Sequence, residues 1–315
     1  MIEMPFSELE ARLEGRIPVI AGCTASGKSS VAMEIASAIP GVEIVSADSR
    51  QFYRGMDIGT AKPLPGELER VPHHMVNIAD PDVLLSAGWY ARRAMEVIED
   101  ILRRGGIPLV VGGSALYIMS LAGLLDDLPS RNDGIRNALG TLEDRLPGAL
   151  HRLLTLVDRA EAETLGRFDR VRLLRSLEIA ILSGERPSAL KGGGNPDGRF
   201  RFALLETEGE ILKERIRRRT AEMMENGLVE EVKGLLDAGY EREPVLGSTI
   251  GYAEVLDHLQ EGSSLEETRE AISTNTWRYA RRQRNMFRRL PGAVRVPRDT
   301  ERITEVLFKE RISHG

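Results

Sequence analysis

Residues 22–29 form a glycine-rich loop of the kind that binds phosphates. They are Gly22-Cys23-Thr24-Ala25-Ser26-Gly27-Lys28-Ser29, which fits the pattern G-x-x-x-x-G-K-[ST]. The backbone N–H groups of such a loop point at one anion, and the positive end of the following helix adds to the attraction. Lys28 supplies a positive charge, and the hydroxyl of Ser29 can hold Mg²⁺. We therefore expect a ligand that carries a diphosphate or a triphosphate. The predicted binding residues are Gly22, Thr24, Ala25, Ser26, Gly27, Lys28 and Ser29.

Polar residues also follow two other predicted strands. Asp48 comes after the apolar run 42–47, and Ser114 follows Gly112-Gly113 after the run 107–111. Ligands of open α/β sheets bind beyond the carboxyl ends of the strands, so we expect both segments to converge on the glycine-rich loop. The residue type of Asp48 leaves three roles open, which are metal ligand, general base and turn former.

The elements that position these residues alternate between strand and helix in the first third of the chain. Apolar runs at 17–21, 42–47 and 107–111 predict buried strands, and 30–39, 87–104 and a segment from 114 predict helices. Further strands are predicted at 200–205 and 294–296, with helices at 210–225, 228–238, 252–260, 265–290 and at the C-terminal end. This order predicts an α/β fold with a P-loop NTPase-like parallel sheet covered by helices.

Residues 126–194 differ in character because only helical patterns occur between 131 and 184. We interpret this stretch as an all-helical domain inserted into the core. The core itself would comprise 1–125 and 195–315, with a helical C-terminal region.

Composition restricts the classes of protein to consider. The 315 residues include one cysteine, Cys23, so an intrachain disulfide is impossible and a reducing cytoplasm is expected. No apolar run reaches the length of a membrane span.

The net charge is −5, yet residues 271–298 contain eight arginines and no acidic residue. A second basic cluster lies at 213–219. Such a local concentration indicates a polyanionic partner, although a solvated helix face is the alternative.

The longer motifs resemble those of bacterial tRNA dimethylallyltransferases. The resemblance includes the glycine-rich loop, Asp48-Ser49-x-x-x-Tyr53-x-Gly55-Met56-Asp57-Ile58-Gly59-Thr60-Ala61-Lys62-Pro63 and Gly112-Gly113-Ser114-x-Leu116-Tyr117. It continues through Arg172-x-x-Arg175-x-Leu177-Glu178, Ile250-Gly251-Tyr252 and Arg282-Gln283. The resemblance implies transfer of a dimethylallyl group from dimethylallyl diphosphate to N6 of the adenine immediately 3′ of the anticodon. The acceptors would be tRNAs that read codons beginning with U.

The resemblance also implies roles for individual residues. Asp48 matches the general base that takes the proton of the adenine amino group. Ser114 stands where the family has a threonine that hydrogen-bonds near the reacting groups. Arg219 matches an arginine that holds the diphosphate. Mg²⁺ would neutralise the leaving group together with Lys28.

The same resemblance places tRNA in two parts of the chain. The helical insertion would hold the anticodon stem-loop, and the basic C-terminal helix would follow its phosphates. The predicted tRNA-binding residues are Asp48, Ser49, Arg50, Gln51, Ser114, Arg136, Arg172, Arg175, Gly251, Tyr252, Arg281, Arg282, Gln283 and Arg288. For the arginines of the insertion, ordinary helix surface charge is an equal alternative. A monomer is expected.

Three other functions use the same loop. A P-loop kinase of a small metabolite or nucleotide would bind ATP there, with Mg²⁺ and an aspartate on the second strand. An isopentenyltransferase of free adenine nucleotides and a P-loop RNA-binding switch are further alternatives. A small substrate needs neither a helical insertion nor an arginine-rich helix, which counts against the first two. The long motif that begins at Asp48 counts against the third.

Overall fold

The computed structural model describes residues 16–126, 128–190, 194–242 and 244–308. They form two compact units, and each is described by itself. The first unit holds the described residues up to Ala122 and from Gly198 onward, and the second spans Gly123–Asp197. The sequence placed the limits of the helical insertion at 126 and 194. Residues 191–193 of the predicted exit linker lie outside the described ranges.

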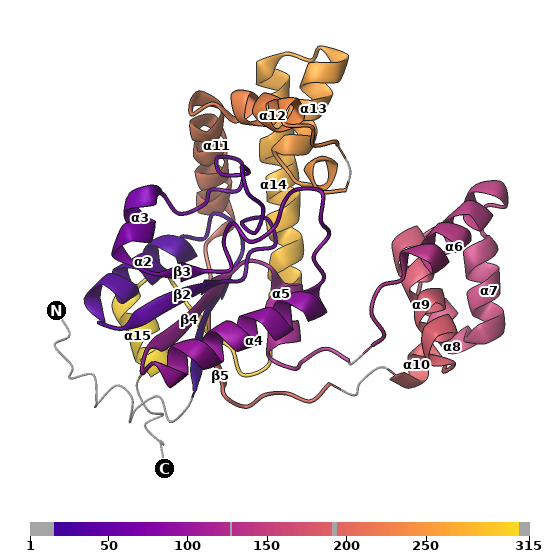
Figure 1. Cartoon of the computed structure of the whole chain (residues 1–315), viewed down its shortest axis with the longest axis horizontal. Coiled ribbons are helices and arrows are strands. Elements are labelled where there is room, and N and C mark those ends of the chain that lie inside the picture. The colour runs from indigo at the N-terminus through magenta and orange to yellow at the C-terminus, as the bar shows by residue number, and fades with distance from the viewer. Residues whose placement is uncertain (1–15, 127, 191–193, 243, 309–315) are drawn as a thin grey trace. The chain divides into compact units, whose positions relative to one another are not determined.

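The first unit is built on a six-stranded parallel sheet (Figure 1). The strands are β1 (Ile17–Gly22), β2 (Val42–Ser46), β3 (His73–His74), β4 (Ile107–Gly112), β5 (Phe200–Leu205) and β6 (Val294–Val296). Their order is β3-β2-β4-β1-β5-β6, and each neighbouring pair is parallel. The prediction of a parallel P-loop-like sheet is therefore confirmed. The two-residue strand β3 was not predicted.

Helices cover both faces of this sheet. On one face, α2 (Lys28–Ala38) and α15 (Thr300–Phe308) share a core cluster with the strands. On the other lie α4 (Ala87–Arg103) and α5 (Ala115–Leu121) (Figure 1). In α4, the buried residues Tyr90, Ala94, Ile98 and Ile101 follow helical spacing, so one stripe of the helix packs inward. The Ser86 hydroxyl caps α4 by accepting a hydrogen bond from the N–H of Trp89.

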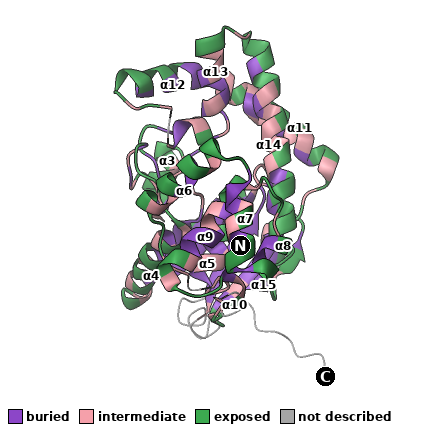
Figure 2. Cartoon of the chain, turned by 90° about the vertical axis from the view of Figure 1, so that its right-hand side faces the viewer, coloured by how far each residue is buried: buried purple, intermediate pink, exposed green. Residues whose placement is uncertain are grey.

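The first unit contains further helices. They are α3 (Pro65–Arg70), α11 (Gly209–Glu225), α12 (Leu228–Asp237), the 3₁₀ turn η1 (Leu246–Ser248), α13 (Tyr252–Glu261) and α14 (Leu265–Phe287). Figure 2 shows buried and exposed positions along α13 and α14. Leu228, Val232, Val255 and Ile272 lie in one core cluster, which also includes Tyr53 and Met56 from the loop after β2. This cluster therefore attaches α12–α14 to a loop of the sheet.

The second unit contains only helices in its described residues, as the sequence predicts. They are α6 (Asp133–Arg145), α7 (Ala149–Val157), α8 (Arg159–Glu163), α9 (Arg170–Ser183) and α10 (Pro187–Leu190). A core of its own, which includes Leu139, Leu150, Leu154, Leu173 and Leu177, holds them together. Within the described ranges of the chain, no helix has both the length and the apolar composition that a membrane crossing requires.

Candidate functional site

The glycine-rich loop connects β1 to α2, as its sequence predicts. Ala25 and Gly27 have positive φ angles of 60° and 93°, which curl the backbone, and Gly27 is the N-cap of α2. The Ser26 hydroxyl is fully buried and has no hydrogen-bond partner among the described residues. Ser26 does not line the pocket described below, although its neighbours Thr24, Ala25, Gly27, Lys28 and Ser29 do.

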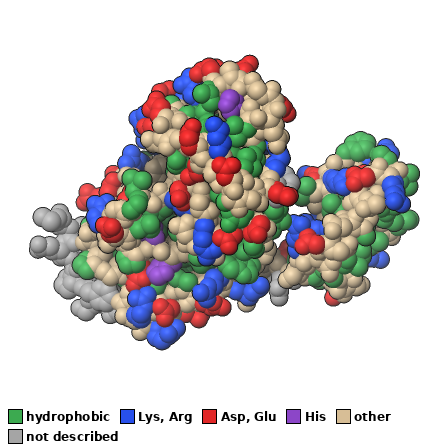
Figure 3. Space-filling model, turned by 45° about the horizontal axis from the view of Figure 1, so that its top comes forward, with side chains coloured by type: hydrophobic (Ala, Val, Ile, Leu, Met, Phe, Trp, Pro, Cys, Tyr) green, Lys and Arg blue, Asp and Glu red, His purple; other side chains and the backbone are tan. Residues whose placement is uncertain are grey.

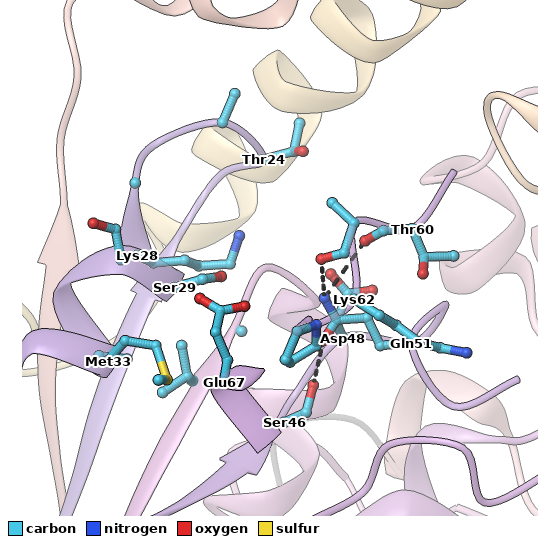
Figure 4. A pocket seen from close by; sticks show the side chains of 18 of the residues that line it. Thr24, Lys28, Ser29, Met33, Ser46, Asp48, Gln51, Thr60, Lys62 and Glu67 are labelled. Carbon is cyan, nitrogen blue, oxygen red and sulfur yellow. Dashed lines mark hydrogen bonds between the residues drawn. The ribbon is translucent and has the colours of Figure 1, made fainter. Parts of the chain in front are cut away.

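The carboxylate of Asp48 faces the same pocket as the loop (Figure 4). Its Oδ1 accepts a hydrogen bond from the N–H of Arg50 at 3.0 Å. The side chains of Lys28 and Ser29 enter this pocket from the start of α2 (Figure 4). Asp48 follows β2 and the loop follows β1, and β4 lies between these strands. The expected convergence at the carboxyl edge of the sheet is therefore present.

Helix α11 contributes most of the remaining positive charge of the pocket. Arg215, Arg218, Arg219 and Glu222 all line it, and their spacing places them on one face of the helix. Arg215 donates to the carbonyl of Ser26 at 3.2 Å, and Arg219 lies 3.4 Å from the hydroxyl oxygen of Thr24. The cavity volume is about 400 Å³. It is thus large enough for a ligand of the size of a prenyl diphosphate.

The electrostatic state of the pocket favours an anion. Burial lowers the pKa of Lys28 and the pKa of Arg219 below their ordinary values, and the negative charge of Asp48 opposes both shifts. Two cations held close together in a partly desolvated site are stabilised when a negative ligand arrives. A negative ligand between these side chains would therefore be favoured electrostatically.

Gln283 of α14, a predicted tRNA contact, connects two segments of the pocket edge. Its side chain is almost completely buried. Its Oε1 accepts a hydrogen bond from the N–H of Thr24 at 2.9 Å, and its Nε2 donates to the carbonyl of Gly113 at 2.7 Å. Gln283 thus ties the phosphate loop to the segment after β4. The predicted tRNA contact by Gln283 stays a prediction.

Ser114 holds the segment that follows Asp48. Its Oγ accepts a hydrogen bond from the N–H of Ser49 at 3.0 Å and lies 3.3 Å from the hydroxyl oxygen of Ser49. Arg50 donates to the carbonyl of Ser248 at 3.1 Å, and Gln51 lines the pocket. These contacts fix the backbone next to Asp48. A direct catalytic hydrogen bond by Ser114, and tRNA contacts by these side chains, stay predictions.

Gly251 and Tyr252, which the sequence predicts to contact tRNA, are both buried, and their contact with tRNA stays a prediction. Gly251 is buried, and its N–H donates to Glu254 at 2.7 Å as α13 begins. Its φ of 96° explains the glycine, since other residues rarely adopt this conformation. Tyr252 is 0% exposed, and its hydroxyl hydrogen-bonds to Glu231. Both residues therefore belong to the packing of α12 and α13.

The predicted arginines of α14 and its C-terminal end are accessible. Arg281, Arg282 and Arg288 are exposed, and the guanidinium of Arg282 lies 5.7 Å from the ring centre of Tyr279. Acidic and basic side chains are interspersed over the face shown in Figure 3. Because charges of both signs are mixed on this face, the local run of arginines on α14 is the feature that indicates a candidate polyanion-binding surface.

The arginines predicted in the helical unit differ from one another. Arg136 donates to Glu178 at 2.9 and 3.0 Å, and Arg175 donates to the same carboxylate at 2.7 Å. The Glu178 side chain is 0% exposed, so both arginines neutralise a buried charge. Their contacts with Glu178 give Arg136 and Arg175 a structural role within the helical unit. Arg172, by contrast, is 67% exposed beside Asp169 and remains a predicted tRNA contact.

Replacing Glu178 by glutamine is expected to destabilise the helical unit by about 3 kcal/mol, because two guanidinium groups lose a buried partner. Hydrogen exchange of the α6–α9 amides in the full chain measures this effect. Glu185→Gln, at an exposed position of the same unit, is the matched control. Equal exchange in both variants would contradict the structural role of the pair.

The contacts of Glu178 also make the stability of the helical unit depend on pH. Burial alone would raise the pKa of Glu178, but hydrogen bonds from Arg136, the N–H of Asn132 and Arg175 lower it from 4.5 to about 2. Because the folded pKa is the lower one, the stabilisation is complete above 4.5 and is lost as the pH falls toward 2.

Sequence reasoning did not assign three residues that line or face the pocket. Arg298 covers Gly27 and donates to the hydroxyl of Ser30 at 2.8 Å. Arg215 belongs to the basic cluster at 213–219, but the sequence did not show that its side chain points toward the glycine-rich loop. The phenol of Tyr279 lies close enough for the charge of Asp48 to raise its pKa, after the larger effect of burial. Helical spacing from Arg219 was the one signal that could have found Arg215.

A family model described as IPP transferase matches residues 51–290 of the chain. A tRNA dimethylallyltransferase of Kosmotoga olearia is 42% identical over 282 residues, which cover 89% of this chain and 91% of that protein. A tRNA dimethylallyltransferase of Geobacter sulfurreducens is 41% identical over 308 residues, which cover 95% of this chain and 98% of that protein.

Two crystal structures are similar to the chain over nearly its whole length. The full-length tRNA isopentenylpyrophosphate transferase of Bacillus halodurans has a TM-score of 0.66 at 32% identity, with 92% of this chain and 94% of that chain covered. A eukaryotic dimethylallyltransferase described as acting on tRNA has a TM-score of 0.75 at 27% identity, with 92% and 76% covered. The similarity thus extends over both units.

Proposed function

The chain belongs to the IPP transferase family, and from this premise we propose that it prenylates tRNA. The reaction transfers a dimethylallyl group from dimethylallyl diphosphate to N6 of the adenine immediately 3′ of the anticodon, in tRNAs that read codons beginning with U. The observation that carries the proposal is the shared pocket of the phosphate loop, Asp48 and Arg219. It combines an anion site with a carboxylate, which is what this transfer needs.

Different pocket residues assist the two bond changes of the transfer. A bond forms between adenine N6 and carbon C1 of the donor, while the bond from C1 to oxygen breaks and its electrons leave with the diphosphate. Lys28, Arg219 and the N–H groups of the loop stabilise the charge that grows on this leaving group. Asp48 accepts the proton that N6 gives up. The adenine is otherwise stacked between its neighbours. It must therefore flip out of the stack so that its amino group can reach Asp48.

Mg²⁺ fits the oxygen donors of this pocket. The hydroxyl of Ser29 and the carboxylates of Asp48 and Glu67 line it, and Mg²⁺ prefers such ligands together with phosphate oxygens and water. Within the described residues, no group of three or more acidic, histidine or cysteine side chains forms a complete metal site. We propose that Ser29 holds the ion against the diphosphate. When bound, Mg²⁺ would neutralise part of the charge of the leaving group.

One experiment separates this function from its alternatives. The protein is incubated with labelled dimethylallyl diphosphate, Mg²⁺ and bulk tRNA. Label in tRNA supports the proposal, and label on free AMP would identify an enzyme of free nucleotides. Turnover of ATP without prenyl transfer would identify a kinase. Binding of tRNA with neither reaction would leave the RNA-binding switch.

The exposed arginines of α14 and its C-terminal end are proposed to bind tRNA phosphates. Neutralising Arg281, Arg282 and Arg288 with glutamine is expected to weaken tRNA binding and to make its salt dependence shallower. The slope of log K against log salt should change by about 0.7–0.9 for each phosphate contact that is lost. Binding measured at several salt concentrations gives the slope.

A matched control removes the same charge elsewhere. Arg92, Arg93 and Arg103 are exposed on α4, and their triple glutamine variant should keep the wild-type slope. An unchanged slope in the α14 variant, or equal changes in both variants, would remove α14 from the RNA interface.

The cellular setting of the protein is also a proposal. We propose a monomer in the cytoplasm, because the single cysteine forms no intrachain disulfide and substrate tRNA is large enough to engage both units. Sedimentation of the free protein and of its tRNA complex tests this stoichiometry. A stable dimer in either sample would contradict it.

A further inference from the structure

The loop after β2 contains a second row of backbone N–H groups that surround an anion. Oε2 of Glu231 accepts hydrogen bonds from the N–H groups of Asp57 and Ile58 at 2.9 and 2.8 Å. Oε1 accepts from the N–H of Gly59 at 3.2 Å and from the hydroxyl of Tyr252 at 2.5 Å. A carboxylate of the protein thus fills this site, in contrast to the phosphate loop. Glu231 lies in the first turn of α12, where the helix dipole favours its negative charge.

The same turn is packed and tied on its other sides. A Cβ at Gly59 would come within 2.4 Å of the Tyr252 ring, so only glycine fits there. Nζ of Lys62 donates to Asp57 at 2.6 Å, to Asn77 at 2.5 Å and to the carbonyl of Tyr53. The Lys62 side chain is only 4% exposed. Residues 57–62, which we call the Glu231 turn, are therefore held by α12, α13 and a buried lysine.

The Glu231 turn also forms part of the pocket wall. Thr60, Ala61 and Lys62 line the cavity that contains Lys28 and Asp48 (Figure 4). From Gln51, Nε2 donates to the carbonyl of Ala61 at 3.1 Å, while Oε1 accepts from the Ser46 hydroxyl at 3.0 Å. Gln51 and Ser46 flank Asp48 in the chain. A shift of the turn would therefore reach the backbone that carries Asp48.

We propose that Glu231 is a positioning residue of the transfer reaction, which acts by holding residues 57–62 against the pocket. This inference rests on the proposed function. Four donors converge on its two oxygens, and an ionised carboxylate has about four acceptor positions. A glutamine has the same shape but offers N–H groups where one oxygen was, so at least one backbone N–H would lose its acceptor. The charge of Glu231, and not only its volume, is what the turn requires.

The test compares Glu231→Gln with Glu230→Gln, which removes a charge from the exposed neighbouring position of the same helix turn. In the Glu231 variant, kcat for prenyl transfer should fall about tenfold, while the Kd for tRNA stays within twofold. The Glu230 variant should match the wild type in both. Tyr252→Phe removes one of the four donors and should lower kcat by less than Glu231→Gln does. The variant that combines both substitutions should be no slower than Glu231→Gln alone.

A second measurement does not depend on activity. Amide hydrogen exchange of residues 55–63 should accelerate about tenfold in Glu231→Gln and remain at the wild-type rate in Glu230→Gln. Faster exchange with unchanged kcat would overturn the positioning role and leave a structural contact. Unchanged exchange would overturn the charge requirement. If the wild type itself transfers no prenyl group, the proposed function fails, and the exchange result still reports on the turn.

Discussion

Replacing Asp48 by alanine is expected to remove nearly all prenyl transfer while tRNA binding stays largely intact. A positioned general base contributes about 10²–10⁴-fold to a rate, so kcat should fall by a factor in this range. Adenine N6 is a weak nucleophile because its lone pair is delocalised into the ring. Loss of its proton during bond formation is therefore the step that a nearby carboxylate can assist.

Asp48→Asn separates the base role from a structural role. Its side-chain oxygen can still accept the hydrogen bond from the N–H of Arg50, which Oδ1 of Asp48 accepts at 3.0 Å. The folded structure is thus preserved, but the amide cannot take a proton. We expect the asparagine variant to be as slow as the alanine variant. Asp82→Asn, at an exposed position, is the control and should keep the wild-type rate.

Kinetic and binding measurements together decide the assignment. Single-turnover rates with both substrates saturating report the chemical step, and filter binding reports the Kd for tRNA. A base role predicts a large decrease in rate with a Kd within about threefold of the wild type. If the Kd increased in proportion to the loss of rate, Asp48 would be a tRNA-binding residue and the proposed mechanism would be wrong.

The parts of the site that the sequence predicted are those with a local signature. The phosphate loop needs only its own eight residues and the flanking strand and helix, and Asp48 is found because parallel strands end at one edge of a sheet. Glu231 has no such signature. It contacts residues 57–59 across more than 170 positions of sequence, so its partner is visible only after α12 and the loop have folded together.

The burial of other predicted residues could not be read from the sequence. Gln283 and Tyr252 lie in motifs that resemble those of the family, but a motif does not say which way a side chain points. Both turn inward, where Gln283 contacts the phosphate loop and Tyr252 packs beneath Gly59. The short elements α3 and β3 were missed for a different reason. Six and two residues are too few to show a period, and β3 exists because it pairs with β2.

Replacing Lys28 by methionine is expected to lower kcat/KM for the prenyl donor by about 10²–10³-fold, which is the cost of removing one group that stabilises developing negative charge. Methionine keeps most of the length and the apolar stem of lysine, so the packing of this buried side chain is retained. The loss should appear in both KM for the donor and kcat, because the charge is present before the reaction and increases during it. The Kd for tRNA should not change. A donor kcat/KM within threefold of the wild type would exclude Lys28 from the diphosphate site.

The pH dependence of the wild type tests the same residue without a substitution. Burial holds the pKa of Lys28 below its ordinary value, and the charge of Asp48 opposes this shift only in part. Because only the protonated form attracts the diphosphate, kcat/KM for the donor should fall as the pH rises toward the lowered pKa, earlier than for an exposed lysine. Lys28→Arg removes this dependence, since a guanidinium stays protonated throughout the range. The two profiles should therefore diverge below pH 10.5, the ordinary pKa of a lysine. Parallel profiles would mean that a group other than Lys28 controls the pH dependence of donor binding.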